Sequence, residues 1–200
     1  MMFATLAVPL AVAMADEAAL ASIHRDIEKK YAQVSHVSGG ELATMLAAPE
    51  QADDIVLFDV REVGEHAVSH LDNAVQVKPG IWTSTFLKKH GSIIKGKTVV
   101  FYCSVGRRSS YAASYLQDAL MKQGAKRVVN LTGGIFSWHN NRRPLKDADG
   151  KTALVHPYNS YWGRLVAREN LTAYSPLSRA QTSTQPSLTG GATNAVPSGQ

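Results

Sequence analysis

The stretch that decides the fold of this chain is TVVFYCSVGRRS, residues 98–109. Its first five residues are β-branched or aromatic, a composition typical of a buried strand. A short loop around Gly106 follows, and over residues 109–122 aromatic and apolar residues recur every four positions, which favours a helix. A strand, a tight loop and a helix in this order place Cys103 at the C-terminal end of the strand, where open α/β sheets bind ligands.

The segments on either side alternate in the same way. Short apolar runs predict strands at residues 55–58, 74–77 and 127–131, and we expect helices from Ser38 to Pro49 and over residues 81–89. Ser38 stands three residues before Glu41, the spacing of a helix capping box, and Pro49 ends the helix. Strands that alternate with helices predict an α/β fold, with an open and mainly parallel sheet flanked by helices on both faces.

The two ends of the chain differ from this core. Residues 1–15 contain an uncharged apolar run that ends in A-M-A and resembles a secretory signal, although no basic residue precedes it and Pro9 interrupts it. The run is too short to span a bilayer, so we expect no stable membrane span. We therefore expect a periplasmic or secreted protein, the alternative being a cytoplasmic one. Residues 16–35 predict an amphipathic N-terminal helix.

The C-terminal part of the chain divides into an aromatic extension and a tail. Residues 149–174 include the stretch HPYNSYWGR at residues 156–164, which is too aromatic for a linker. We expect this extension to pack against the domain, and the alternative is a lid over the site that contains Cys103. Residues 175–200 are so rich in Gly, Pro, Ser and Thr that they predict a disordered tail.

Composition and charge narrow the function classes. The chain has 200 residues and a single Cys, which excludes an internal disulfide framework and a Cys-rich zinc site. The net charge of +5 would suit nucleic acid, but no binding motif supports such a partner. Residues 16–72 hold twelve acidic residues against four Lys and Arg, whereas residues 73–146 hold thirteen Lys and Arg against one acidic residue, Asp118. The basic half contains Cys103, and such a distribution indicates either a site that attracts a small anion or a solvated basic face.

The loop around Cys103 has the features of an anion-binding nest. A tight loop before a helix turns its backbone N–H groups toward one point, and the helix N-terminus adds positive potential there. With the sulfur of Cys103 at the centre of the loop, the bound anion would be its own thiolate, which is the nucleophilic form of the side chain. Arg107 and Arg108 would favour the same anion.

Three motifs, in the same order along the chain, resemble those of rhodanese-type sulfurtransferases. Residues 103–109 (CSVGRRS) are similar to the family's active-site loop, C-x-x-G-x-R-[ST]. Residues 59–62 (DVRE), with Glu65 and the His70-Leu71 pair downstream, resemble its D-V-R-E…E…G-H-I signature, and residues 132–138 (TGGIFSW) resemble its G-G-x-x-x-W motif. The resemblance covers a domain at residues 36–148. The chain departs from the family pattern at His66, Ser69 and Asn73, all in the loop after the first strand.

The resemblance implies a reaction and a set of roles. Cys103 would take a sulfane sulfur from a small anionic donor such as thiosulfate, hold it as a persulfide, and pass it to cyanide or an external thiol. The substrate-binding residues would be those of the loop, with Arg108 on the sulfonate end of the donor and Arg107 as a helper: Ser104, Val105, Gly106, Arg107, Arg108 and Ser109. Asp59 and Arg61 would frame the pocket, and no cofactor is implied.

Several alternatives stay open at this point. Phosphatases and arsenate reductases on the same fold use a longer C-x5-R loop, which would need Arg where Ser109 stands. A binding or sulfur-carrier module without turnover is a second alternative, because a fold does not guarantee a reaction. His66 and His70 are four residues apart, like paired metal ligands, but no third ligand has convincing spacing, so we expect no metal site.

Overall fold

Five parallel strands form the central sheet, in the order β1-β5-β4-β2-β3. In a computed structural model of the chain, residues 10–176 are described. The strands are β1 (Ser35–Val37), β2 (Ile55–Asp59), β3 (Val75–Gln76), β4 (Thr98–Tyr102) and β5 (Arg127–Leu131). The expected α/β fold is confirmed, and β2, β4 and β5 lie within one residue of their predicted positions. The three-residue strand β1 was not predicted.

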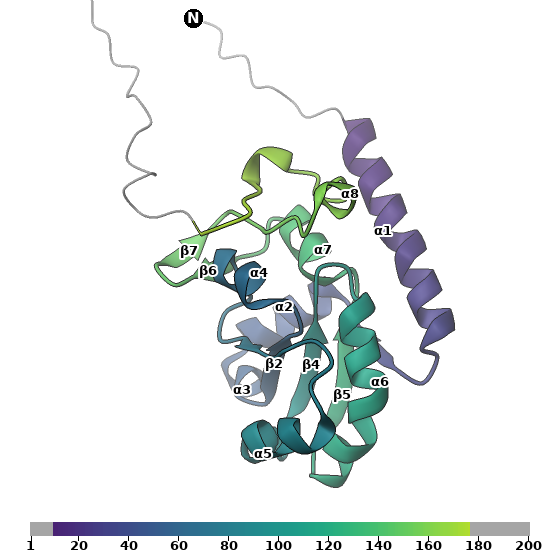
Figure 1. Cartoon of the computed structure of the whole chain (residues 1–200), viewed down its shortest axis with the longest axis vertical. Helices are drawn as coiled ribbons and strands as arrows, with labels where there is room; N and C mark the ends of the chain where they lie inside the picture. The colour runs from purple at the N-terminus through teal and green to yellow at the C-terminus, as the bar shows by residue number, and fades with distance from the viewer. Residues whose placement is uncertain (1–9, 177–200) are drawn as a thin grey trace, which may run out of the picture.

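The central strand β4 divides its side chains between two cores. Val100 and Tyr102 pack on one face with side chains of α2 (Gly39–Ala47) and α7 (Gly134–Asn140). Val99 and Phe101 pack on the other face with side chains of α5 (Thr83–Ile94) and α6 (Arg107–Lys122). All four of these strand side chains are fully buried. A strand covered on both faces reads as a continuous apolar run, which is why the sequence signal was strong here. Figure 1 shows α5 and α6 in front of the sheet and α2 behind it.

The helices agree with the sequence pattern in outline. Ser38 caps α2 by accepting a hydrogen bond from the N–H of Glu41, and the helix ends before Pro49, which begins the short helix α3 (Pro49–Ala52). Helix α5 begins at Thr83 and continues to Ile94, five residues beyond the predicted end. Helix α4 (Val63–Val68) occupies part of the segment that was expected to be a loop. A capping box between Glu62 and Glu65 stabilises its first turn.

The N-terminal helix α1 runs from Leu10 to Lys30 instead of over residues 16–35. Its earlier start is explained by the sequence of residues 10–15 (LAVAMA), in which Ala, Leu and Met are strong helix formers. The predicted secretory signal lies in part outside the described residues. Between residues 10 and 176, no helix has the length and apolar character needed to cross a membrane.

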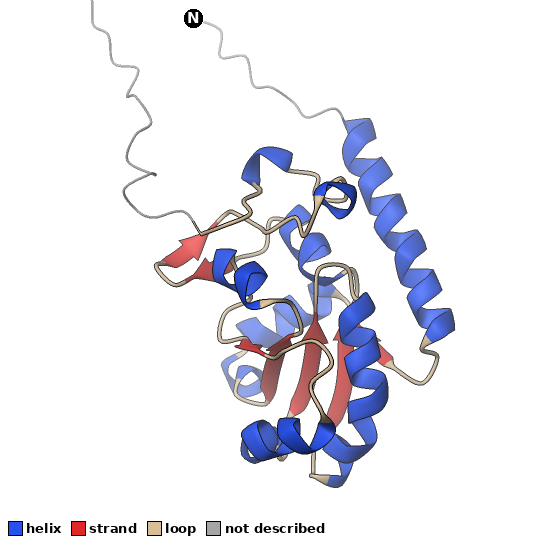
Figure 2. Ribbon diagram, viewed as in Figure 1, coloured by secondary structure: helices blue, strands red, loops and turns tan. Residues whose placement is uncertain are grey.

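The chain beyond the sheet folds over the C-terminal ends of the strands (Figures 1 and 2). It forms the hairpin of β6 (Leu145–Asp147) and β7 (Gly150–Thr152), the one-turn helix α8 (Ser160–Gly163) and the 3-10 turn η1 (Glu169–Leu171). Val155 and Val166 are fully buried in the core that contains α7. The extension therefore packs against the domain. Most of the predicted tail, residues 177–200, lies outside the described part.

Candidate active site

The loop after β4 wraps around the sulfur of Cys103. The Sγ atom accepts a hydrogen bond of 3.2 Å from the N–H of Gly106, and the residue is 1% exposed. Gly106 makes this turn possible because its φ of 97° lies in the left-handed region that suits glycine. A β-carbon there would also lie 3.2 Å from Nδ2 of Asn130. Helix α6 begins at the next residue, so its N-terminus points toward the sulfur site.

Helix α7 holds the other side of the loop. The carbonyl groups of Cys103 and Ser104 accept hydrogen bonds from the N–H groups of Ile135 and Phe136, at 2.9 and 3.0 Å. In a trans peptide the N–H points opposite to the C=O. The N–H groups of Ser104 and Val105 therefore point away from α7. The two carbonyl groups are thus bound to α7, and anion binding by the loop N–H groups stays a prediction.

Arg108 lies at the start of α6 and is held by the carboxylate of Glu65. Its Nη1 and Nη2 atoms donate to Glu65 Oε2 and Oε1 at 2.7 and 2.8 Å, and Nη2 also donates to the Ser104 hydroxyl at 3.0 Å. The Glu65 side chain is only 4% exposed. Burial alone would lower the pKa of Arg108, but Glu65 and the nearby Cys103 sulfur raise it above its usual value. Arg108 is thus a fixed cation beside the sulfur, and it forms an ion pair with the buried carboxylate of Glu65.

Asp59 and Arg61 form a second, deeper network. The Arg61 side chain is fully buried, and its Nε and Nη2 atoms donate to the Asp59 carboxylate at 2.9 and 2.6 Å. Nη2 also binds the carbonyl of Ser69, while Tyr102 and His66 contact Asp59 at 3.0 and 2.9 Å. Burial alone would raise the pKa of Asp59, but Arg61 and His66 outweigh it and lower the pKa to about 2. Through the carbonyl of Ser69, this pair is joined to the C-terminal end of α4, the helix that carries Glu65.

Two aromatic side chains from the C-terminal extension complete the pocket above the sulfur. A cavity of about 200 Å³ is lined by Cys103, Ser104, Val105, Arg107, Arg108, Tyr158 and Trp162. The Tyr158 ring lies 4.9 Å from the Arg108 guanidinium, and the Trp162 ring lies 5.9 Å from that of Arg107. The segment that was expected to pack against the domain therefore also lines the pocket, and whether it acts as a lid stays a prediction. A larger cavity of about 410 Å³, between α1 and α7, does not include Cys103.

The structure brings together most of the predicted site residues. The pocket is lined by five of them: Cys103, Ser104, Val105, Arg107 and Arg108. Ser109 is fully buried and donates a hydrogen bond to Asn130, and Asp59 and Arg61 are fully buried and are not among the lining residues, in keeping with the supporting role expected for them. The His66 and His70 rings stack at 4.0 Å, and in the described part of the chain no three His, Cys, Asp or Glu side chains are grouped to hold a metal ion.

Sequence reasoning missed the roles of Glu65, Tyr158 and Trp162. Glu65 belongs to the DVRE motif region, but nothing in the sequence says that its partner is Arg108, 43 residues away. Tyr158 and Trp162 lie in the aromatic stretch that was noted as unusual for a linker. That stretch was the signal that pointed to them.

The fold and the site define a class of α/β proteins that hold a cysteine sulfur in a tight loop at the end of a central parallel strand. The chain belongs to the rhodanese-like domain family, whose sequence model matches residues 38–141. It is 32% identical to a sulfurtransferase of Allochromatium vinosum, over 58% of this chain and 99% of that protein. It is 29% identical to the thiosulfate sulfurtransferase GlpE of Coxiella burnetii, over 60% of this chain and 96% of that protein.

The fold is also similar to that of a solved structure. A protein of unknown function from Rhodopseudomonas palustris, described as a possible tyrosine phosphatase, aligns with a TM-score of 0.50 and 20% identity. The alignment covers 62% of this chain and 93% of that protein. At this identity the likeness concerns the fold alone.

Proposed function

We propose that this protein is a sulfurtransferase that moves a sulfane sulfur from thiosulfate, or a similar small anionic donor, to cyanide or an external thiol. The observation that carries the proposal is the position of Cys103: the residue is 1% exposed, its sulfur accepts a hydrogen bond from a backbone N–H, and it lines a small pocket with two arginines. The relatives named as sulfurtransferases support the same reaction class.

The reaction proceeds in two steps. The Cys103 thiolate attacks the outer sulfur of thiosulfate, a new S–S bond forms, and the bond to the sulfonate sulfur breaks with release of sulfite. The persulfide anion then occupies the pocket, where the loop N–H groups stabilise its charge. A cyanide or thiolate acceptor attacks the terminal sulfur, and Cys103 leaves as the thiolate. No separate general base is needed when the nucleophile is already ionised.

The two arginines have different parts in this scheme. Arg107 is exposed, lines the pocket and has no carboxylate partner in the described part of the chain, so its charge is available to an incoming anion. Arg108 keeps a fork of donors next to the sulfur, but Glu65 occupies two of them. A donor that binds Arg108 does so in competition with Glu65.

The test is the mass of the intact protein after incubation with thiosulfate. We expect one added sulfur atom, which cyanide removes as thiocyanate, and we expect Cys103→Ser to abolish both changes. Because Cys103 is the only cysteine in the sequence, the added mass has one thiol to which it can attach.

Two other readings give different results. Hydrolysis of p-nitrophenyl phosphate without sulfur uptake would favour a phosphatase. Absence of both sulfur uptake and thiocyanate formation would leave the binding module as the better description.

A further inference from the structure

The wall of the Cys103 pocket is made partly by residues outside the family domain. The match to the rhodanese-like domain ends at residue 141, whereas Tyr158 and Trp162 belong to the extension that follows. The two rings lie against the guanidinium groups of Arg108 and Arg107, so each loop arginine carries an aromatic partner. The pocket of this chain therefore differs in its lining from what the loop motif alone would specify.

The extension holds these rings in a fixed position. Asn159 caps α8 by accepting a hydrogen bond from the N–H of Trp162, and the N–H of Tyr158 donates to His156 Nδ1 at 2.9 Å. Tyr158 has a φ of 66°, a left-handed conformation that a residue with a β-carbon adopts at a cost of about 1 kcal/mol. Such strain persists where the surroundings fix it and is common at ligand-binding sites.

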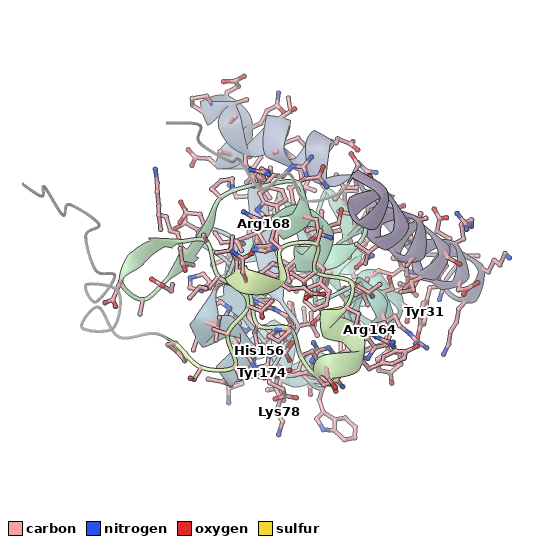
Figure 3. The ribbon with its side chains drawn as sticks, turned by 90° about the horizontal axis from the view of Figure 1, so that it is seen from above. Tyr31, Lys78, His156, Arg164, Arg168 and Tyr174 are labelled. Carbon is pink, nitrogen blue, oxygen red and sulfur yellow. The ribbon has the colours of Figure 1, made fainter. Side chains whose placement is uncertain are left out.

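Contacts within the extension supply that fixation. The ring of His156 packs edge-on against Tyr174 at 5.4 Å, and the two residues lie side by side in Figure 3. Val155 pairs with Thr172 in a parallel bridge, and Val155 itself is fully buried. The wall is therefore part of the folded protein before a substrate arrives.

The charge of the pocket suits a donor with one negative charge. Glu65 neutralises Arg108 through two hydrogen bonds, which leaves Arg107 as the cation without a carboxylate partner among the described lining residues. Inorganic thiosulfate is a dianion, so its second charge would face a guanidinium already paired with a carboxylate. Apart from Cys103, Ser104 and the two arginines, the lining residues are Val105, Tyr158 and Trp162, whose side chains suit an apolar group.

We propose that Tyr158 and Trp162 are specificity-determining residues that favour an organic thiosulfonate, with one negative charge and an apolar body, over inorganic thiosulfate as the sulfur donor. This inference rests on the proposed sulfurtransferase function. The cavity of about 200 Å³ has the volume of roughly seven water molecules in the liquid, which leaves room for an apolar group beside the reacting sulfurs. The sulfonyl oxygens would lie toward Arg107.

The reaction is balanced in the same way as with thiosulfate. The Cys103 thiolate attacks the terminal sulfur of R–SO2–S⁻, the bond between the two donor sulfurs breaks, and the electron pair leaves with the sulfinate R–SO2⁻. Cys103 keeps the transferred sulfur as a persulfide anion. Two negative charges enter the step and two leave it, and no oxidant or reductant is consumed.

The experiment compares benzenethiosulfonate with thiosulfate as donors and uses cyanide as the acceptor for both. We expect Tyr158→Ala and Trp162→Ala each to lower the ratio of kcat/KM for benzenethiosulfonate to that for thiosulfate by roughly two- to tenfold, the effect of one aromatic contact. Both donors are measured on the same preparation of each variant. A misfolded fraction therefore lowers both kcat/KM values equally and leaves their ratio unchanged. Comparison with the wild-type ratio also removes the intrinsic reactivity of each donor.

Two control variants test whether a change in the ratio comes from loss of an aromatic ring in the pocket or from substitution of any tyrosine. Tyr158→Phe keeps the ring and should keep the wild-type ratio. Tyr111→Ala removes an exposed tyrosine on α6 whose ring contacts Tyr115 and not the pocket, and it too should keep the ratio. In a complementary variant, Glu65→Gln leaves the Arg108 charge unpaired, and the ratio should fall because thiosulfate gains a counter-charge.

The outcomes are distinct. An unchanged ratio in both alanine variants, or equal losses with the two donors, would overturn the specificity role while leaving the sulfurtransferase function in place. Absence of sulfur transfer from either donor by the wild-type protein would overturn the proposed function and this inference with it.

Discussion

At the scale of single residues, His139 connects stability to pH. Its imidazole is fully buried in α7, and Nε2 donates to the carbonyl of Ala153 at 2.9 Å. Burial lowers the pKa of His139 from 6.5 to about 4, so the folded protein holds the ring neutral at a pH where the unfolded chain would protonate it. The free energy of unfolding that depends on this group is therefore complete above pH 6.5 and is lost as the pH falls toward 4.

We expect the wild-type protein to lose roughly 2 kcal/mol more of its free energy of unfolding than His139→Gln between pH 7.5 and pH 5. Glutamine keeps an N–H donor for Ala153 but does not titrate. The measurement is urea unfolding of both proteins at the two pH values. Burial also lowers the pKa of His36, His70, His90 and His156, and the comparison removes their shared contribution. Parallel pH profiles for the two proteins would contradict the role of His139.

At the scale of elements, the first turn of α7 shapes the loop of Cys103. Gly134 has a φ of 57°, and a β-carbon on it would lie 2.3 Å from the carbonyl oxygen of Cys103 and 2.6 Å from that of Ser104. Those two oxygens belong to the backbone and cannot move without opening the loop. We expect Gly134→Ala to lower the free energy of unfolding by more than about 3 kcal/mol, a severe effect for one methyl group, and to reduce sulfur uptake by Cys103.

Gly64 is the matched control for this prediction. It lies in the short helix α4, no heavy atom is within 4 Å of the β-carbon it would gain, and its φ is not in the left-handed region. Gly64→Ala should change the free energy of unfolding by less than about 1 kcal/mol and leave sulfur uptake unchanged. Thermal melting and the intact-mass assay measure both variants. Equal stability of the two variants would show that α7 does not constrain the loop.

The same elements show what the sequence could predict. Strands β2, β4 and β5 were predicted because their side chains are covered on both faces and form continuous apolar runs. Strand β1 has three residues, of which only Val37 is buried, so no period could reveal it. Gly133 and Gly134, at the start of helix α7, predicted a turn, and they do form one, since both have a positive φ that leads into the helix.

The site was predictable where the chemistry is local and unpredictable where it depends on distant parts of the chain. Cys103, the Gly106 turn and the loop arginines follow one another within six residues. The contact between Glu65 and Arg108 spans 43 residues, and the contact between Tyr158 and Arg108 spans fifty. These contacts are set by how α4, α6 and the extension meet, and a single sequence gives no direct signal for them.

At the scale of the whole molecule, the C-terminal extension is part of the folded domain. Asn140 donates to the carbonyl of Leu165 and accepts from the N–H of Ala167, both at 2.9 Å. Arg168 donates to the carbonyl of His139 at 2.6 Å. These bonds join the extension to α7, the helix that also holds the Cys103 loop. Loss of the extension would therefore remove the pocket wall that contains Tyr158 and Trp162. It would also remove the hydrogen bonds that join the extension to α7, the helix that supports the Cys103 loop.

We expect a chain that ends at Leu154 to lose more than about 3 kcal/mol of its free energy of unfolding, because burial of one such valine contributes about 1.5–3 kcal/mol and both Val155 and Val166 would be absent. A chain that ends at Pro176 lacks only residues that the sequence predicts to be disordered, and its unfolding should match that of the full chain. Urea unfolding of the full chain and of the two shortened chains shows whether the extension contributes to the stability of the domain. If the chain ending at Leu154 unfolds at the same urea concentration as the full chain, the extension is an independent appendage, and the aromatic wall above Cys103 is not fixed by the fold.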